Sequence, residues 1–206
     1  MSLVGDPERS LSAFVLEAFD AMAPGGGYRF TPSSREPTDP TNPRDPHYDG
    51  LRDTIRVGGG VLALGSDDGA TYCCGVTFAC WWDALVRAGC PLPDDPVDSE
   101  ALLAEWFCPT MGHPGVVDAL VDRGWGGRVG LQEARPGDLV QYWRRTELAS
   151  PSGHSAIWLA LEGGRLHYAS SQPATDGVGR HAEEVGEAWQ IHVVRPWFLR
   201  ADIVLT

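Results

Sequence analysis

Residues 71–89 read TYCCGVTFACWWDALVRAG and predict a single amphipathic helix. The run contains no proline, carries Arg87 in its expected last turn and ends in Gly89, a residue type that commonly follows a helix. We expect the helix to start near Cys73. Its buried stripe should comprise Val76, Ala79, Cys80, Ala84 and Leu85.

Three other segments carry helix signals. Residues 10–23 place apolar side chains at helical spacing, and Ser10 is the expected N-cap. Residues 99–107 (SEALLAEWF) begin with Ser99 as an expected cap, and residues 114–123 (PGVVDALVDR) predict a further helix.

The last third changes from helical to strand-like patterning. Short runs rich in β-branched and aromatic residues are separated by turns, and Glu162-Gly163-Gly164 predicts a tight hairpin between two of them. Helices followed by an antiparallel sheet are typical of the α+β class, with the N-terminal helices packed on the sheet. The predicted strands are residues 138–143, 154–161, 165–170 and 190–196.

The length of 206 residues fits a single domain, residues 1–206. Within it we distinguish an N-terminal flank, residues 1–70, from a core, residues 71–206. Residues 31–50 hold five prolines and many small polar residues, which is typical of an irregular segment. That segment is either a solvated loop or a cover over part of a cleft.

Composition excludes several classes of function. The 16 basic and 28 acidic residues give a net charge of −12, which disfavours nucleic acid and membrane surfaces as partners. None of the five cysteines forms a C-x-x-C pair, so we expect no metal and no other cofactor. No secretory signal or membrane span is visible, so we expect a cytoplasmic protein or one exported without a Sec signal. The oligomeric state stays open.

Cys73 is the strongest nucleophile candidate because of its position. Free backbone N–H groups and the positive end of the helix dipole stabilise a thiolate at a helix N-terminus. The backbone N–H groups there can also face a developing oxyanion. Gly75 is expected to leave space for a substrate backbone. The alternative interpretation is that Cys73 and Cys74 are small apolar packing residues.

His154 is the candidate general base. A Pro136-Gly137-Asp138 turn precedes one predicted strand, and Gly153-His154 begins the next. A histidine at the start of a strand can point out of the sheet toward the N-terminus of a packed helix. A lone histidine there is otherwise a half-exposed strand residue, and the two motifs together are more specific than either alone.

These motifs together resemble the NlpC/P60 superfamily of papain-like cysteine hydrolases, over residues 71 to about 172. The matching residues are Cys73-Cys74-Gly75, Pro136-Gly137-Asp138-Leu139-Val140, Gly153-His154-Ser155-Ala156-Ile157-Trp158-Leu159 and Tyr168-Ala169-Ser170. The resemblance implies a cysteine on a helix and a histidine on a sheet. It also implies a cysteine peptidase or amidase that cleaves amide bonds, usually in peptidoglycan stem peptides.

The chain departs from the family pattern at several positions. Tyr72 and Cys74 replace the Asp and Ser that usually flank the nucleophile, so Cys74 is a weaker alternative to Cys73. The family's third polar residue aligns with Tyr168. Ser170 and Gln172 share its strand parity and are candidates for orienting the imidazole.

The resemblance therefore implies Cys73 as the nucleophile that forms a thioester acyl-enzyme and His154 as the base. We expect Tyr72, Gly75, Gly153 and Tyr168 to contact the substrate, a peptide or peptidoglycan fragment. Two alternatives remain open. One is an acyltransferase or thioesterase of the same superfamily, and the other is a catalytically silent domain that binds a peptide or partner.

Overall fold

A computed structural model describes residues 10–30, 49–90, 92, 96–107, 112–145 and 152–197, and these residues form an α+β fold. The predicted α+β class is confirmed, because helices are combined with a large antiparallel sheet, most of whose strands follow the helices along the chain. Residues 31–48, predicted to be irregular, lie outside the described residues. Within the described ranges, no helix is both long and apolar enough to cross a bilayer.

The helix bounds agree with the sequence for one helix and differ for the others. Helix α2 (Cys73–Ala88) begins and ends as predicted, with Gly89 in the left-handed conformation. Helix α1 (Ser12–Asp20) is shorter than predicted, although the Oγ of Ser10 accepts a hydrogen bond from the Ser12 N–H at 3.1 Å. Helix α4 (Val116–Val121) is also shorter.

Helix α3 (Pro96–Trp106) corrects a predicted boundary. It begins three residues before Ser99, so Ser99 lies within the first turn and is not the N-cap. Its side chain is only 1% exposed. Pro96 explains the earlier start, because proline is favoured in the first turn, where its missing N–H costs no intrahelical hydrogen bond.

Seven strands form one antiparallel sheet in the described part of the chain, in the order β1-β8-β7-β6-β5-β9-β4. The four predicted strands are present, and the hairpin turn at residues 162–164 joins two of them. They are β5 (Leu139–Arg145), β6 (Ser152–Glu162), β7 (Arg165–Gln172) and β9 (Gln190–Pro196).

Five further strands were not predicted. The largest is β8 (Gly177–Glu184), which pairs with β7 from residue 177 to residue 184. Its sequence, GVGRHAEE, is glycine-rich and charged, and therefore lacks the usual strand signal. The others are β1 (Gly25–Gly26), β4 (Gly126–Val129) and the separate hairpin of β2 (Ile55–Val57) and β3 (Gly60–Ala63).

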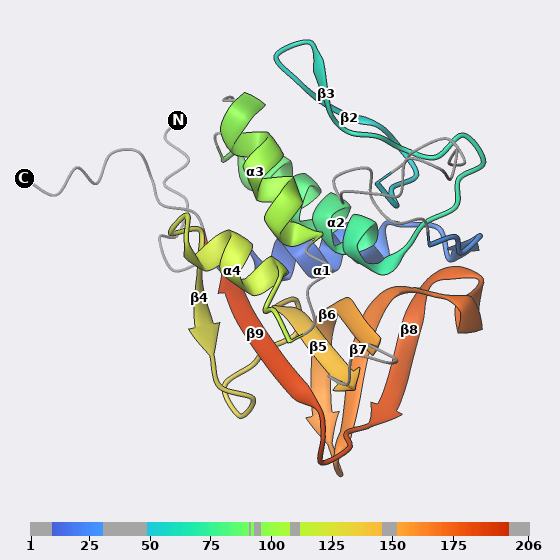
Figure 1. The fold of residues 1–206 in the computed structure, drawn as a ribbon, viewed down its shortest axis with the longest axis vertical. Coiled ribbons are helices and arrows are strands. Elements are labelled where there is room, and N and C mark those ends of the chain that lie inside the picture. Colours follow the sequence, from blue (N-terminus) through green and yellow to red (C-terminus); the bar gives the residue numbers. More distant parts are fainter. Residues whose placement is uncertain are drawn as a thin grey trace, which may run out of the picture.

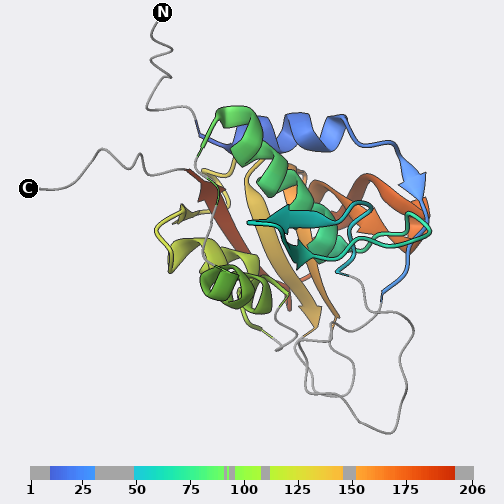
Figure 2. The ribbon, with the colours of Figure 1, turned by 90° about the horizontal axis from the view of Figure 1, so that it is seen from above.

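The helices cover one face of the sheet, as Figures 1 and 2 show from two directions. On that face, Ile157, Ala169 and Val194 pack against the helices in the main core. On the opposite face, strand residues such as Tyr142, Trp158 and Tyr168 form a second buried cluster of their own. The sheet therefore carries two cores, one on each side.

The N-terminal flank is built into this fold. Helix α1 packs on α2, β1 pairs with β8, and Tyr28 bridges to Thr71 just before the candidate nucleophile. Figure 2 shows α1 lying alongside the helical layer. The described part of the flank, residues 10–30 and 49–70, therefore packs together with the core.

The Pro136-Gly137-Asp138 motif anchors α1 to the sheet. Gly137 has a φ of 91°, and a side chain there would collide with the backbone of Ser12. The buried Asp138 accepts hydrogen bonds from the Ser12 hydroxyl at 2.6 Å and from Arg195 at 3.0 and 3.2 Å. Glycine and aspartate in this motif therefore serve the packing of α1.

Candidate active site

The candidate nucleophile stands at the first residue of α2. The preceding residue, Tyr72, has an extended backbone and provides no side-chain cap, so the N–H groups of the first turn are not used by a capping side chain. Cys73 is only 7% exposed and belongs to the main buried core. Its position at the start of the helix favours a thiolate.

His154 lies near the start of β6, opposite Tyr142 of β5 in the strand register. Its ring makes edge-on contacts with the rings of Tyr142 and Tyr168, at centroid distances of 5.4 and 5.7 Å. The side chain is 7% exposed. Its Nε2 atom is buried and has no hydrogen-bond partner among the described residues. Aromatic packing therefore holds the imidazole.

The structure brings Cys73 and His154 together. The pKa of Cys73 is well below its ordinary value of 9.0. A hydrogen bond from the Cys74 thiol contributes most to this decrease; burial opposes it, and the charge and approach of the His154 ring lower the pKa further. No hydrogen bond of ordinary length joins the Cys73 and His154 side chains. Hydrogen bonds between a nucleophile and its general base are often long in the absence of substrate.

Cys74 differs from Cys73 in its surroundings. Its sulfur lies 3.8 Å from the Cys73 sulfur and 3.4 Å from the Ser155 hydroxyl oxygen. Hydrogen bonding to Cys73 and burial raise its pKa well above the ordinary value. The opposite directions of the two shifts make Cys73 the more readily ionised thiol of the pair, which favours Cys73 as the nucleophile.

The residues predicted to orient the imidazole do not contact it by hydrogen bonds. The Ser170 hydroxyl donates to the backbone oxygen of Ser155 at 2.8 Å. The Gln172 amide donates to the hydroxyl of Tyr168. Ser170 thus supports the strand that carries His154, and Gln172 supports a ring that packs against it. The prediction of a direct orienting role for either residue was wrong for this structure, because their polar atoms are engaged elsewhere.

A charged pair behind Tyr168 was missed by the sequence analysis. Glu183 of β8 accepts hydrogen bonds from the Tyr168 hydroxyl and from Arg144 of β5. Burial raises the pKa of Glu183, but hydrogen bonds from Arg144 and Tyr168 outweigh that effect and lower it to about 2. The sequence contained no signal for this pairing, because β8 itself was not recognised.

All four of the predicted substrate contacts, Tyr72, Gly75, Gly153 and Tyr168, take part in internal packing. Tyr72 is 1% exposed, and its ring packs edge-on against Phe30 and Phe107. A side chain at position 75 would collide with the backbone of Gly50, so the space beside Gly75 holds a loop of the chain itself. The exposed Gly153 lies under the indole ring of Trp143. Tyr168 is 0% exposed and lies in the second buried cluster. Tyr72, Gly75 and Tyr168 are therefore corrected to structural roles.

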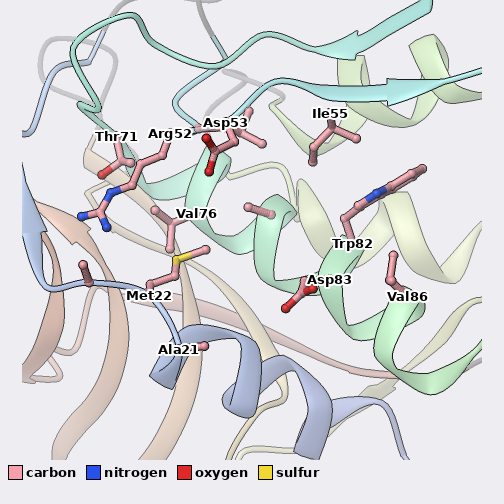
Figure 3. A pocket seen from close by; sticks show the side chains of 13 residues that line it. Ala21, Met22, Arg52, Asp53, Ile55, Thr71, Val76, Trp82, Asp83 and Val86 are labelled. Atoms are coloured by element: carbon pink, nitrogen blue, oxygen red, sulfur yellow. The ribbon is translucent and has the colours of Figure 1, made fainter. Parts of the chain in front are cut away.

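A cavity of about 430 Å³ lies on another side of α2. Figure 3 shows it between the end of α1, the loop before β2 and one face of α2. Neither Cys73 nor His154 lines it, so it is separate from the cysteine–histidine pair. Its lining includes apolar side chains and three charged ones: Met22, Val76, Trp82, Arg52, Asp53 and Asp83.

The remaining thiols and potential metal ligands form no second centre in the described part of the chain. Burial raises the pKa of Cys80, which is 0% exposed, and the pKa of Cys90 is also raised. Cys108 lies outside the described residues. No group of three or more His, Cys, Asp or Glu side chains within the described ranges converges as metal ligands would.

Comparisons of the chain with protein-family models, curated protein sequences and solved structures found no match.

Proposed function

We propose that this chain is a papain-like cysteine hydrolase of the NlpC/P60 type that cleaves amide bonds. The observation that carries the proposal is the meeting of a helix-start thiol, whose pKa is lowered, with an imidazole on the neighbouring sheet. A low thiol pKa close to a general base is typical of nucleophilic cysteines. The motif order Cys73-x-Gly75, Pro136-Gly137-Asp138 and Gly153-His154 supports the family assignment.

The proposed reaction is acyl transfer through a thioester. The Cys73 proton passes to His154, and the thiolate attacks the substrate carbonyl carbon. The backbone N–H at the start of α2 faces the oxyanion, since it has no partner within the helix. His154 then protonates the leaving amine, and a water molecule, deprotonated by His154, hydrolyses the thioester.

The proposed substrate is a peptide or peptidoglycan fragment. Family resemblance supports this class, and the acidic net charge of −12 argues against polyanionic substrates. The site leaves two other possibilities to be separated by experiment. If water is not the acceptor, the protein is an acyltransferase, and if Cys73 is inert, the domain binds peptides without cleaving them.

The test is incubation of the full chain with a mixture of muropeptides and short synthetic peptides, with products identified by mass spectrometry. We expect cleavage of an amide bond that Cys73→Ala and His154→Ala both abolish, while Cys80→Ala, a change at a buried thiol elsewhere on α2, retains it. A transferred acyl group on an added amine would identify the acyltransferase alternative. Absence of any product, together with no accelerated alkylation of Cys73, would overturn the enzymatic proposal.

A further inference from the structure

Four polar side chains lie in a row at the start of α2. The Cys73 and Cys74 sulfurs are 3.8 Å apart, and the Cys74 sulfur lies 3.4 Å from the Oγ of Ser155. The Ser155 hydroxyl donates to the Oε1 of Gln141 at 2.6 Å. The row therefore runs from the proposed nucleophile through a second thiol to two neighbouring strands, β6 and β5.

The donors in this row can be assigned by elimination. An amide Oε1 can only accept, so the single proton of Ser155 points to Gln141. The Ser155 oxygen is then available to Cys74 only as an acceptor. Cys74 has one proton and two neighbouring acceptors, the Ser155 oxygen and the Cys73 sulfur. Which of them receives the proton depends on the charge of Cys73.

A thiolate is a much stronger acceptor than a neutral hydroxyl, because charge-assisted hydrogen bonds are the stronger ones. The Cys74 proton therefore points to Cys73 when Cys73 is ionised. Once Cys73 is protonated or acylated, its sulfur is a weak acceptor and the Cys74 proton turns to Ser155. The row thus contains a donor that is engaged only when the nucleophile carries its charge.

We propose that Cys74 is a positioning residue that stabilises the Cys73 thiolate through its S–H group, and that Ser155, fixed by Gln141, receives that S–H group when Cys73 is neutral. The inference rests on the proposed function, because it assigns Cys73 as the nucleophile. Cys74 keeps its own proton throughout, and the proton lost by Cys73 goes to His154.

The surroundings of Cys73 are consistent with this assignment. The charged or titratable groups that act on Cys73 are Cys74 on its own helix and His154 on β6, while the Ser155 backbone supplies a further hydrogen bond. Tyr168 packs against the His154 ring, and His181 and Glu183 interact electrostatically with His154, but none of the three is among the groups that act on Cys73. Removal of Cys74 therefore takes away the largest influence that favours the thiolate.

The experiment measures the rate of Cys73 alkylation by iodoacetamide across pH, with the modified peptide identified by mass spectrometry. The full chain is compared with Cys74→Ala, Cys74→Ser and Ser155→Ala, after circular dichroism has shown that each is folded. We expect Cys74→Ala to slow alkylation at about pH 6 by about ten-fold or more, since each pKa unit changes the thiolate fraction about ten-fold. The variant and the parent should converge at high pH, where Cys73 is ionised in both.

Cys74→Ser keeps a donor and should restore the low-pH reactivity, and Ser155→Ala keeps the Cys74 donor and should retain it. Cys74→Val fills more of the site without a donor and replaces Cys74→Ala if that variant does not fold. The proposal would be overturned if the alkylation rates of the parent and of Cys74→Ala (or Cys74→Val) followed the same pH profile. It would also be overturned if Cys73 in the Cys74→Ser variant were alkylated as slowly as in Cys74→Ala. Peptide hydrolysis is assayed separately, so hydrolysis that persists with unchanged profiles rejects only the role of Cys74.

Discussion

Replacement of Asp138 by alanine should destabilise the protein strongly without changing the cysteine–histidine pair. Asp138 is 0% exposed and accepts hydrogen bonds from the Ser12 hydroxyl, from Arg195 and from the backbone N–H of Arg135. Alanine would leave the Arg195 charge and the Ser12 hydroxyl without this acceptor. These contacts join α1 and β9 to the turn before β5, so their loss should loosen the attachment of the flank.

The size of the effect follows from the geometry of the pair. Breaking a buried ion pair by removing one partner costs about 3–5 kcal/mol. The Arg195 side chain is 20% exposed and keeps a hydrogen bond to the Glu133 backbone oxygen, so the lower part of that range applies. Loss of the Ser12 hydrogen bond is part of this cost, which gives a total of about 3–4 kcal/mol. For a domain of this size, the melting temperature should fall by about 6–16 °C.

The assay is urea unfolding followed by circular dichroism, with Asp67→Ala as the matched control. Asp67 is 84% exposed in its ion pair with Arg29, so its replacement should cost under about 1 kcal/mol. In a double-mutant cycle, Asp138→Ala combined with Arg195→Met should cost clearly less than the two single changes added together. A decrease in unfolding free energy below about 1 kcal/mol for Asp138→Ala would refute the anchoring role, because removing a buried carboxylate that forms an ion pair should destabilise the protein by more than that.

Three other changes test separate parts of the structure. Gly75→Ala should prevent or severely impair folding, as judged by soluble expression and circular dichroism, because the added methyl group meets the backbone of a facing loop; a stable variant would contradict this packing. In the native protein, Cys73 should alkylate well below pH 9 while Cys80 stays unmodified until the protein unfolds, since the thiol pKa is lowered at the first and raised at the second. Glu183→Gln should cost about 1–2 kcal/mol near neutral pH, allowing for solvent screening of the pair with Arg144. Because the folded-state pKa of Glu183 is lowered to about 2, this gap in unfolding free energy should shrink as pH falls from about 4.5 toward 2, and a constant gap would count against the ion pair.

The helix that carries Cys73 was predictable because its signals are local. Apolar spacing, the absence of proline and a C-terminal glycine all act within one segment, and α2 follows them closely. The four predicted strands were recognisable for the same reason, since residues 138–143 and 190–196 are rich in β-branched and aromatic residues. By contrast, β8 forms because β7 offers a partner along its length, which its own polar sequence does not signal.

Only part of the candidate site was predictable from the sequence, for the same reason. Motif order selected Cys73 and His154, and the structure brings them together. The sequence did not identify what surrounds them, because those contacts join residues far apart in the chain. Ser170 and Gln172 have the right strand parity, yet their polar atoms bond to a backbone oxygen and to Tyr168.

By itself, the sequence determined the α+β class and the position of the cysteine helix, and it singled out Cys73 and His154 as candidates, because each depends on local pattern and residue chemistry. Only the tertiary structure decided which of the two thiols has the lowered pKa, what packs against the imidazole and where the described part of the flank packs. Those outcomes depend on burial and on partners such as Ser155 and Glu183, which chain folding brings close from distant strands. Distances between side chains on different elements are set by packing, and no single segment contains them.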